Sequence, residues 1–271
     1  MAKVICVANQ KGGVGKTTTA INLAASLAAA EKRTLLIDMD PQGNAGSGLG
    51  VDVQSGTPNI YHALIGEKSI RETIHPTDLN FLDLVPANQD LIGAEIELVG
   101  AIARETKLKS AIEKIRADYD FVIIDCPPSL GLLTLNAITA ADSVLIPLQC
   151  EYYAMEGLTR LLNTVDLIKE SLNSALSIEG ILLTMYDRRN NICKDVVSEV
   201  KKHFEASAFE SIIPRNVRLS EAPSFGKPII LYDVSSKGCE SYLKLAKEVI
   251  TRNTSKDEYV SIAMHKIASL N

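Results

Sequence analysis

Tryptophan is absent from the 271-residue sequence and aromatic residues make up only 5% of it, so a nucleic-acid binder that stacks bases on aromatic rings is not expected. No apolar run approaches the roughly 18 residues that a membrane span needs, and residues 1–6 turn polar too soon for a secretory signal. The five cysteines are odd in number and form no CxxC pair, which argues against a disulfide framework or a zinc site. We therefore expect a cytoplasmic protein with no stable membrane association.

Positive charge is also scarce, because the formal net charge is −5. Residues 1–184 carry 14 Lys and Arg against 22 Asp and Glu, whereas residues 185–228 carry eight against six. A chain that is acidic overall is not expected to bind nucleic acid through bulk charge, but a local basic face stays possible. The hydrophobic content of 46% is enough for a sizeable core.

Short β-branched runs alternate with longer helical patterns along the chain. This alternation predicts an α/β fold, a mostly parallel twisted sheet flanked by helices, in a single domain over residues 1–271. Ser255–Asn271 is expected to be a terminal helix or a frayed tail, since it lacks the large apolar and basic residues of a membrane-surface helix. We expect strands at Val4–Val7, Thr34–Ile37, Phe121–Ile124, Ser143–Leu148 and Ile178–Leu183, helices at Thr17–Ala30, Leu91–Ala117, Ala154–Ser171 and Asn191–Phe204, and loops at Gly43–Gly50 and Pro214–Pro228.

The segment from residue 10 to residue 18, Q-K-G-G-V-G-K-T-T, joins the first expected strand to the first expected helix. This is the setting of a P-loop, in which glycines curl the backbone so that its N–H groups and the helix N-terminus face phosphates. Lys16 is expected to reach the β- and γ-phosphates of ATP, and the Thr17 hydroxyl to bind Mg²⁺. The expected nucleotide-binding residues of this segment are Lys11, Gly12, Gly13, Val14, Gly15, Lys16, Thr17 and Thr18.

The segment departs from the usual P-loop at its start. Gln10 replaces the first glycine, and Lys11 is too early to be the P-loop lysine of its own subunit. Its charge is instead expected to serve a phosphate across a dimer interface, as an arginine finger does. This is the deviant Walker A motif K-G-G-x-G-K-T, and the sequence resembles the ParA/MinD family of ATPases.

Three carboxylates follow buried strands. Asp38 and Asp40 stand at the end of the second expected strand, where open α/β sheets bind ligands. The resemblance implies that Asp40 positions the water that attacks the γ-phosphate, and Asp38 is expected to support the loop and the magnesium shell. Asp125 ends the strand Phe121–Ile124 as a Walker B carboxylate that holds Mg²⁺ through a water. Cys126 is expected to be a small packing residue, because no His lies nearby in sequence.

The resemblance covers Lys3 to about Arg252 and is most specific to chromosomal ParA proteins of the Soj type. Two further segments carry the resemblance: Pro147–Leu158, and Ile213–Ser224, which reads I-P-R-N-V-R-L-S-E-A-P-S. The resemblance implies that Pro214, Arg215 and Asn216 lie beside the adenine.

The resemblance implies a chromosome or plasmid partitioning ATPase in the bacterial cytoplasm at the nucleoid. Such a protein forms an ATP-sandwich homodimer, binds DNA without sequence preference and hydrolyses ATP when a ParB-type centromere-binding partner stimulates it. A membrane-positioning ATPase of the MinD type shares residues 11–18 but ends in a basic amphipathic anchor. A reductase-like relative would hold an iron–sulfur cluster between two subunits through paired cysteines. Cys126 and Cys150 are enough in number for this, but the segments around them resemble those of ParA proteins.

The locally positive segment, residues 185–228, is the expected DNA surface. The scarcity of aromatics predicts phosphate contact rather than base readout. The resemblance supports Arg189 and Arg218 as the leading contacts. Lys194, Lys201 and Lys202 are weaker candidates, with Lys194 and Lys201 two turns apart on one helical face.

Overall fold

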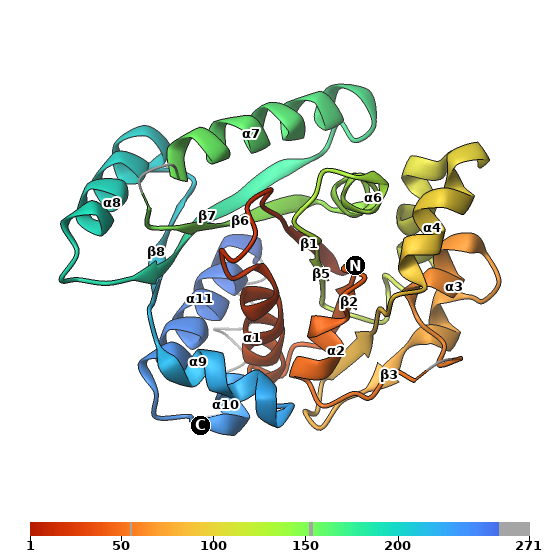
Figure 1. Ribbon diagram of the computed structural model, residues 1–271, viewed down its shortest axis with the longest axis horizontal. Coiled ribbons are helices and arrows are strands. Elements are labelled where there is room, and N and C mark those ends of the chain that lie inside the picture. The colour runs from red at the N-terminus through yellow and green to blue at the C-terminus, as the bar shows by residue number, and fades with distance from the viewer. Residues whose placement is uncertain (55, 152–153, 255–271) are drawn as a thin grey trace, which may run out of the picture.

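In the described part of the chain all the strands belong to one sheet, and the carboxyl ends of its parallel strands lie along a single edge (Figure 1). The computed structural model describes residues 1–54, 56–151 and 154–254. Every neighbouring pair of strands is parallel except the antiparallel pair at the β3 edge. The order across the sheet is β3 (His75–Pro76), β4 (Leu82–Val85), β2 (Thr34–Asp38), β5 (Phe121–Asp125), β1 (Lys3–Val7), β6 (Ser143–Gln149), β7 (Ser177–Tyr186) and β8 (Ala208–Pro214).

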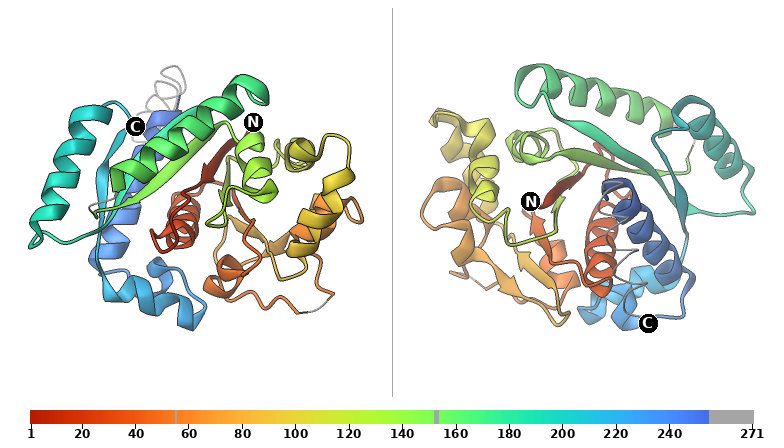
Figure 2. Two further views of the ribbon diagram at one scale, coloured as in Figure 1. Left: turned by 45° about the horizontal axis from the view of Figure 1, so that its top comes forward. Right: turned by 180° about the vertical axis from the view of Figure 1, so that it is seen from behind.

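Helices cover both faces of the sheet, so its central strands are apolar on both sides. In β1, Val4 and Cys6 join one core and Ile5 and Val7 join the other. Figure 2 shows the two helical layers, with α7 in green and α11 in blue on opposite sides. One layer contains α3 (Ile60–Ile65), α4 (Leu91–Glu97), α5 (Lys107–Glu113), α6 (Leu132–Ala140), α7 (Ala154–Ser171) and α8 (Asn191–Phe204); the other contains α1 (Lys16–Ala29), α2 (Asn44–Gly48), α9 (Val217–Glu221), α10 (Ile229–Tyr232) and α11 (Lys237–Asn253).

The expected fold class is confirmed, but the expected helix Leu91–Ala117 is wrong. The segment is broken into α4, two short 3₁₀ turns at Leu98–Gly100 and Arg104–Thr106, and α5. Buried Asn136 of α6 makes the break possible, because its side chain accepts from the N–H of Leu108 and donates to the carbonyl of Arg104. Backbone groups that a continuous helix would pair are satisfied from a neighbouring helix instead.

The two expected loops contain short helices. Residues 43–50 include α2, which begins after Gly43 at φ +64°, where a Cβ atom would lie 2.7 Å from the carbonyl oxygen of Ala87. Residues 214–228 include α9 and a 3₁₀ turn at Ala222–Phe225. Residues 43–50 come after β2 and residues 214–228 begin at the end of β8, at the carboxyl ends of parallel strands, where ligands of an α/β sheet bind. The expected terminal element 255–271 lies outside the described residues.

Candidate functional site

The glycine-rich segment between β1 and α1 has the geometry of an anion-binding loop. Gly13 and Gly15 adopt left-handed φ values of +73° and +86°, and a side chain at either position would be strained. Gly15 stands directly before the first turn of α1. Successive N–H groups of such a turn face inward and add to the positive end of the helix dipole. The loop therefore has the backbone geometry of a phosphate-binding loop, and we call it the phosphate cradle.

Lys16 is the cation of this cradle. Its side chain is only 7% exposed, and its ammonium group donates to the carbonyl of Lys11 at 3.2 Å. Burial lowers the pKa of Lys16, while the carboxylates of Asp125 and Asp40 oppose that shift. A buried ammonium with one backbone acceptor and no direct ion pair among the described residues retains donors for an anion.

Asp38 and Asp125 are adjacent on β2 and β5 and fully buried. Asp38 holds the following loop, because its carboxylate accepts from the N–H groups of Asp40 and Ala45. Neither oxygen of Asp125 has a hydrogen-bond partner within the described part of the chain. Burial raises the pKa of Asp125 well above its usual range, Asp38 adds to the shift, and the nearby Thr17 hydroxyl opposes it. An unpaired buried carboxylate beside a threonine hydroxyl is a donor set that fits Mg²⁺ and its waters.

Two cavities extend from this loop. The first, of about 390 Å³, is lined by the glycines of the loop together with Lys16, Thr17 and Asp40. The second, of about 380 Å³, is lined in part by Pro214, Arg215 and Asn216. Asn216 also caps α9 by accepting from the N–H of Arg218. The two cavities share lining residues, so one elongated ligand can occupy both.

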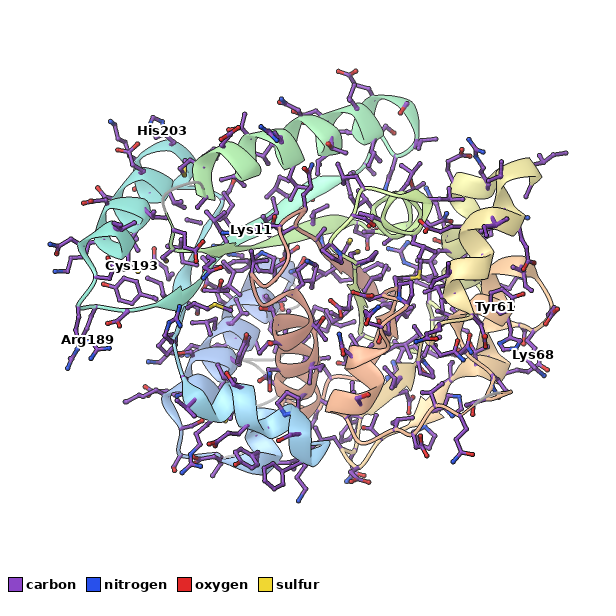
Figure 3. All side chains as sticks on the ribbon, viewed as in Figure 1. Lys11, Tyr61, Lys68, Arg189, Cys193 and His203 are labelled. Atoms are coloured by element: carbon purple, nitrogen blue, oxygen red, sulfur yellow. The ribbon has the colours of Figure 1, made fainter. Side chains whose placement is uncertain are left out.

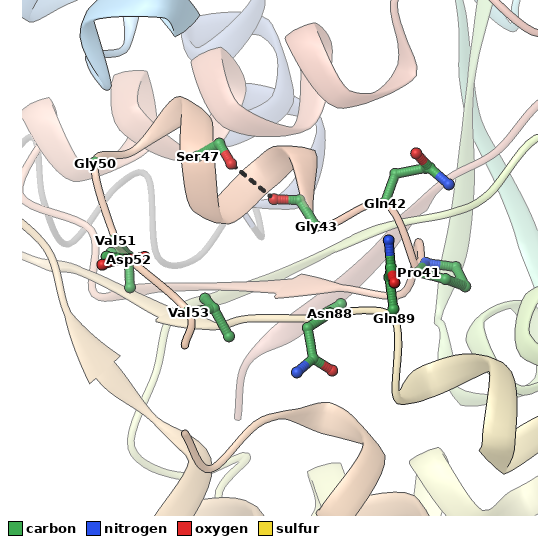
Figure 4. Close-up of a pocket in the computed structure, with 11 residues that line it drawn as sticks. Pro41, Gln42, Gly43, Ser47, Gly50, Val51, Asp52, Val53, Asn88 and Gln89 are labelled. Atoms are coloured by element: carbon green, nitrogen blue, oxygen red, sulfur yellow. Dashed lines mark hydrogen bonds between the residues drawn. The ribbon is translucent and has the colours of Figure 1, made fainter. Parts of the chain in front are cut away.

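A third cavity, of about 370 Å³, borders the segment that follows Asp40 (Figure 4). Residues 41–53 and 87–89 supply its walls, and the Ser47 hydroxyl donates to the carbonyl of Gly43 there. It shares Gln42 with the phosphate cavity. Residues of the segment after Asp40 therefore line both cavities.

The Lys11 side chain contacts Glu151 rather than the phosphate cradle of its own chain. It does not line the phosphate cavity, and its ammonium forms an ion pair with Glu151, with both side chains 47% exposed. The expectation that Lys11 serves a phosphate across a dimer interface stays a prediction. No sequence pattern identified Glu151 as the partner of Lys11.

Of the expected DNA contacts, Arg189 lies at the left margin of the molecule, whereas Lys11 lies near its centre (Figure 3). Arg189 is 85% exposed and forms two hydrogen bonds with the carboxylate of Asp187. Arg218 pairs with Glu221 at 2.9 Å and Asp233 at 3.4 Å. Both expected arginines therefore form exposed ion pairs with neighbouring carboxylates.

The cysteines agree with a packing role. Cys126 is fully buried, and its sulfur lies 3.1 Å from that of Cys6. Burial raises the pKa of the Cys126 thiol, which keeps it protonated. Cys150 is also buried, against Cys193.

Comparison with known proteins decides the family. A family model described as "AAA domain" matches residues 2–178. The chain is 64% identical over 256 residues to the chromosome partitioning protein ParA of Myxococcus xanthus, covering 94% of this chain and 90% of that one. It is 58% identical to the sporulation initiation inhibitor protein Soj of Bacillus subtilis, covering 92% and 98%. The chain belongs to the ParA/MinD family of ATPases. It is a partitioning ATPase of the Soj type.

A solved structure agrees with the fold of this ParA-type ATPase. Cobyrinic acid a,c-diamide synthase from Mycobacterium smegmatis, with bound ADP and magnesium, superposes with a TM-score of 0.82 at 38% identity, covering 94% of this chain and 98% of that one. Within the part of the chain that the structure describes, no helix is both long and apolar enough to cross a membrane.

Several residues at the site were not expected from the sequence. Thr184 and Met185 line the cavity beside Pro214–Asn216, and the Thr184 hydroxyl donates to the carbonyl of Val14 at 2.9 Å. Both follow the expected strand Ile178–Leu183, so the rule that ligands bind at the carboxyl ends of parallel strands could have found them.

Proposed function

We propose that this chain is a single-domain partitioning ATPase that binds ATP and Mg²⁺ in the two joined cavities, dimerises around the nucleotide and binds DNA in that state. A ParB-type partner stimulates hydrolysis, and the protein acts at the nucleoid in the cytoplasm. The observation that carries the proposal is that the site at the glycine loop holds both a buried lysine without an ion pair, Lys16, and a buried carboxylate without a hydrogen-bond partner, Asp125, among the described residues. A divalent metal carrying phosphates satisfies both groups at once.

The proposal assigns a role to each residue of the two cavities that was expected from the sequence. Lys16 and the loop N–H groups bind the β- and γ-phosphates, while Thr17 and, through water, Asp125 hold the metal, with Asp38 in the surrounding shell. Mg²⁺ offsets the negative charge that develops on the phosphate oxygens. Pro214, Arg215 and Asn216 flank the base. Asp40, which lines the phosphate cavity, orients the attacking water.

The direct test measures ATP hydrolysis alone, with DNA, and with DNA plus a candidate ParB-type protein. The proposal expects slow hydrolysis that only the full mixture accelerates, and an ATP-dependent dimer in size-exclusion chromatography. Co-sedimentation with liposomes would support the MinD-type alternative instead, and visible absorbance of the purified protein would support the iron–sulfur alternative.

Replacing Lys11 by alanine is expected to weaken ATP-dependent dimerisation by about tenfold or more and leave ADP affinity within about threefold. The reason is that Lys11 lies outside its own phosphate cavity and is proposed to reach the partner's nucleotide. Analytical ultracentrifugation and nucleotide titration measure the two effects. Exposed Lys169 on α7 supplies the control, Lys169→Ala, which should change neither. Equal losses of ADP binding and dimerisation would contradict a role across the interface.

Arg189→Ala and Arg218→Ala are expected to lower affinity for every DNA sequence alike and leave ATP binding and dimerisation intact. A two-fold dimer aligns two copies of the basic segment, and each lost phosphate contact should reduce the slope of log affinity against log salt by about one. Because Arg189 must leave Asp187 to contact a phosphate, Asp187→Ala should strengthen binding.

Arg71→Ala is the matched control for both arginines. Arg71 is exposed and paired with Asp118 at 2.7 Å, in the same manner as Arg189, but lies on the η1 turn (Ile70–Thr73) outside the basic segment. DNA binding unchanged in both test variants, with the ATP-bound dimer confirmed, would place the DNA surface elsewhere.

A further inference from the structure

Met185 has an unusual backbone at the end of β7. Its φ is +52°, in the left-handed region that residues other than glycine rarely adopt. The pairing of β7 with β8 shifts register between Leu183 and Tyr186, so the chain bulges at this point. Bulges beside ligand sites redirect side chains.

Both flanks of Met185 are fixed by contacts to other parts of the site. On one side the Thr184 hydroxyl donates to the carbonyl of Val14 in the P-loop at 2.9 Å. On the other side the Tyr186 carbonyl accepts from the N–H of Arg215 at 3.0 Å. A strained conformation persists where its surroundings determine it in this way. The two contacts tie Met185 between the phosphate loop and the base-side loop.

Met185 also lies where the two cavities meet. The residues that line both cavities are Gly15, Thr18 and Met185. Gly15 and Thr18 belong to the P-loop motif, which leaves Met185 as the shared residue from outside it. A ligand that occupies both cavities must pass these three residues.

We propose that Met185 is a nucleotide-positioning residue. Its left-handed backbone holds its side chain at the junction of the phosphate and base cavities, where the side chain fixes the position of the base relative to the phosphates. This inference rests on the proposed nucleotide site. The thioether side chain is apolar and adaptable, and it is half-buried at this position. It offers packing to the part of the nucleotide between base and phosphates, and no charge to the phosphates themselves.

The test compares two ligands, ADP and inorganic tripolyphosphate, which fills the phosphate cavity alone. Met185→Gly tolerates the positive φ, so it is expected to fold. It should weaken ADP binding by about tenfold and leave tripolyphosphate binding within about twofold. Met185→Ala should behave like Met185→Gly, and Met185→Leu, which keeps an apolar side chain, should stay near the wild type.

Phe81→Gly is the matched control, because Phe81 has φ +67° in a turn before β4 and lines neither cavity. It should leave both affinities unchanged. Unchanged ADP binding by Met185→Gly, or equal loss of ADP and tripolyphosphate, would overturn the proposal. So would near-normal ADP binding by Met185→Ala, which would assign the effect to the backbone. Failure of the wild type to bind ADP would instead overturn the nucleotide site.

Discussion

Replacing Lys16 by alanine is expected to lower the affinity for ATP by about 100-fold or more. The ammonium is buried beneath the glycine cradle and faces the phosphate cavity, where it donates to one backbone carbonyl. Charge-assisted hydrogen bonds to phosphate are strong in a site closed to water, and no other cation lines this cavity in the part of the chain that the structure describes. Titration with ATP and ADP measures the loss.

Two further variants keep this prediction open to refutation. Lys16→Met keeps the length of the side chain without its charge, so it should lose ATP binding as fully as Lys16→Ala while preserving the packing. Lys3→Ala removes another partly buried lysine, which pairs with Glu179 at 3.4 Å away from both cavities, and should bind ATP normally. If Lys16→Met folds and binds ATP with near-native affinity, the phosphate cradle is assigned to the wrong loop.

The phosphate cradle could be predicted from sequence because its determinants are contiguous. Residues 10–18 contain the glycines, the lysine and the threonine in an order fixed by local backbone geometry, and β1 and α1 flank them as expected. Asp38 and Asp125 were also predictable, because each ends a buried strand and parallel strands share one carboxyl edge. The roles of these residues stay predictions.

The rest of the site depends on contacts between distant segments, which periodicity does not contain. The break between α4 and α5 depends on Asn136, whose side chain accepts from the N–H of Leu108. These two residues are 28 positions apart in the sequence. The partner of Lys11 is 140 residues away, at Glu151. Counting charges in residues 185–228 could not show which charges meet in space, here Arg189 with Asp187 and Arg218 with Glu221.

Replacing Asp40 by alanine is expected to reduce the rate of ATP hydrolysis by about 100- to 10,000-fold, the range for losing a group that activates or orients the attacking water. ATP binding should persist, so the variant should accumulate as a nucleotide-bound dimer. Asp40 lines the phosphate cavity, and one of its oxygens accepts from the N–H of Gln42, which fixes the carboxylate. Asp38 is different, because its oxygens support the loop backbone. Asp38→Ala should therefore lower the melting temperature, which Asp40→Ala should leave nearly unchanged.

Asp52→Ala separates the carboxylate at position 40 from a general effect of charge on the same segment. Asp52 is exposed and lines the third cavity rather than the phosphate cavity, so its loss should leave hydrolysis and dimerisation near the wild type. Single-turnover hydrolysis and size-exclusion chromatography with ATP measure the two readouts. The charge removed is the same at both positions, and what differs is its distance from the cleaved phosphate. A monomeric Asp40→Ala that hydrolyses ATP at the normal rate would show that this carboxylate neither orients water nor controls the release of the dimer.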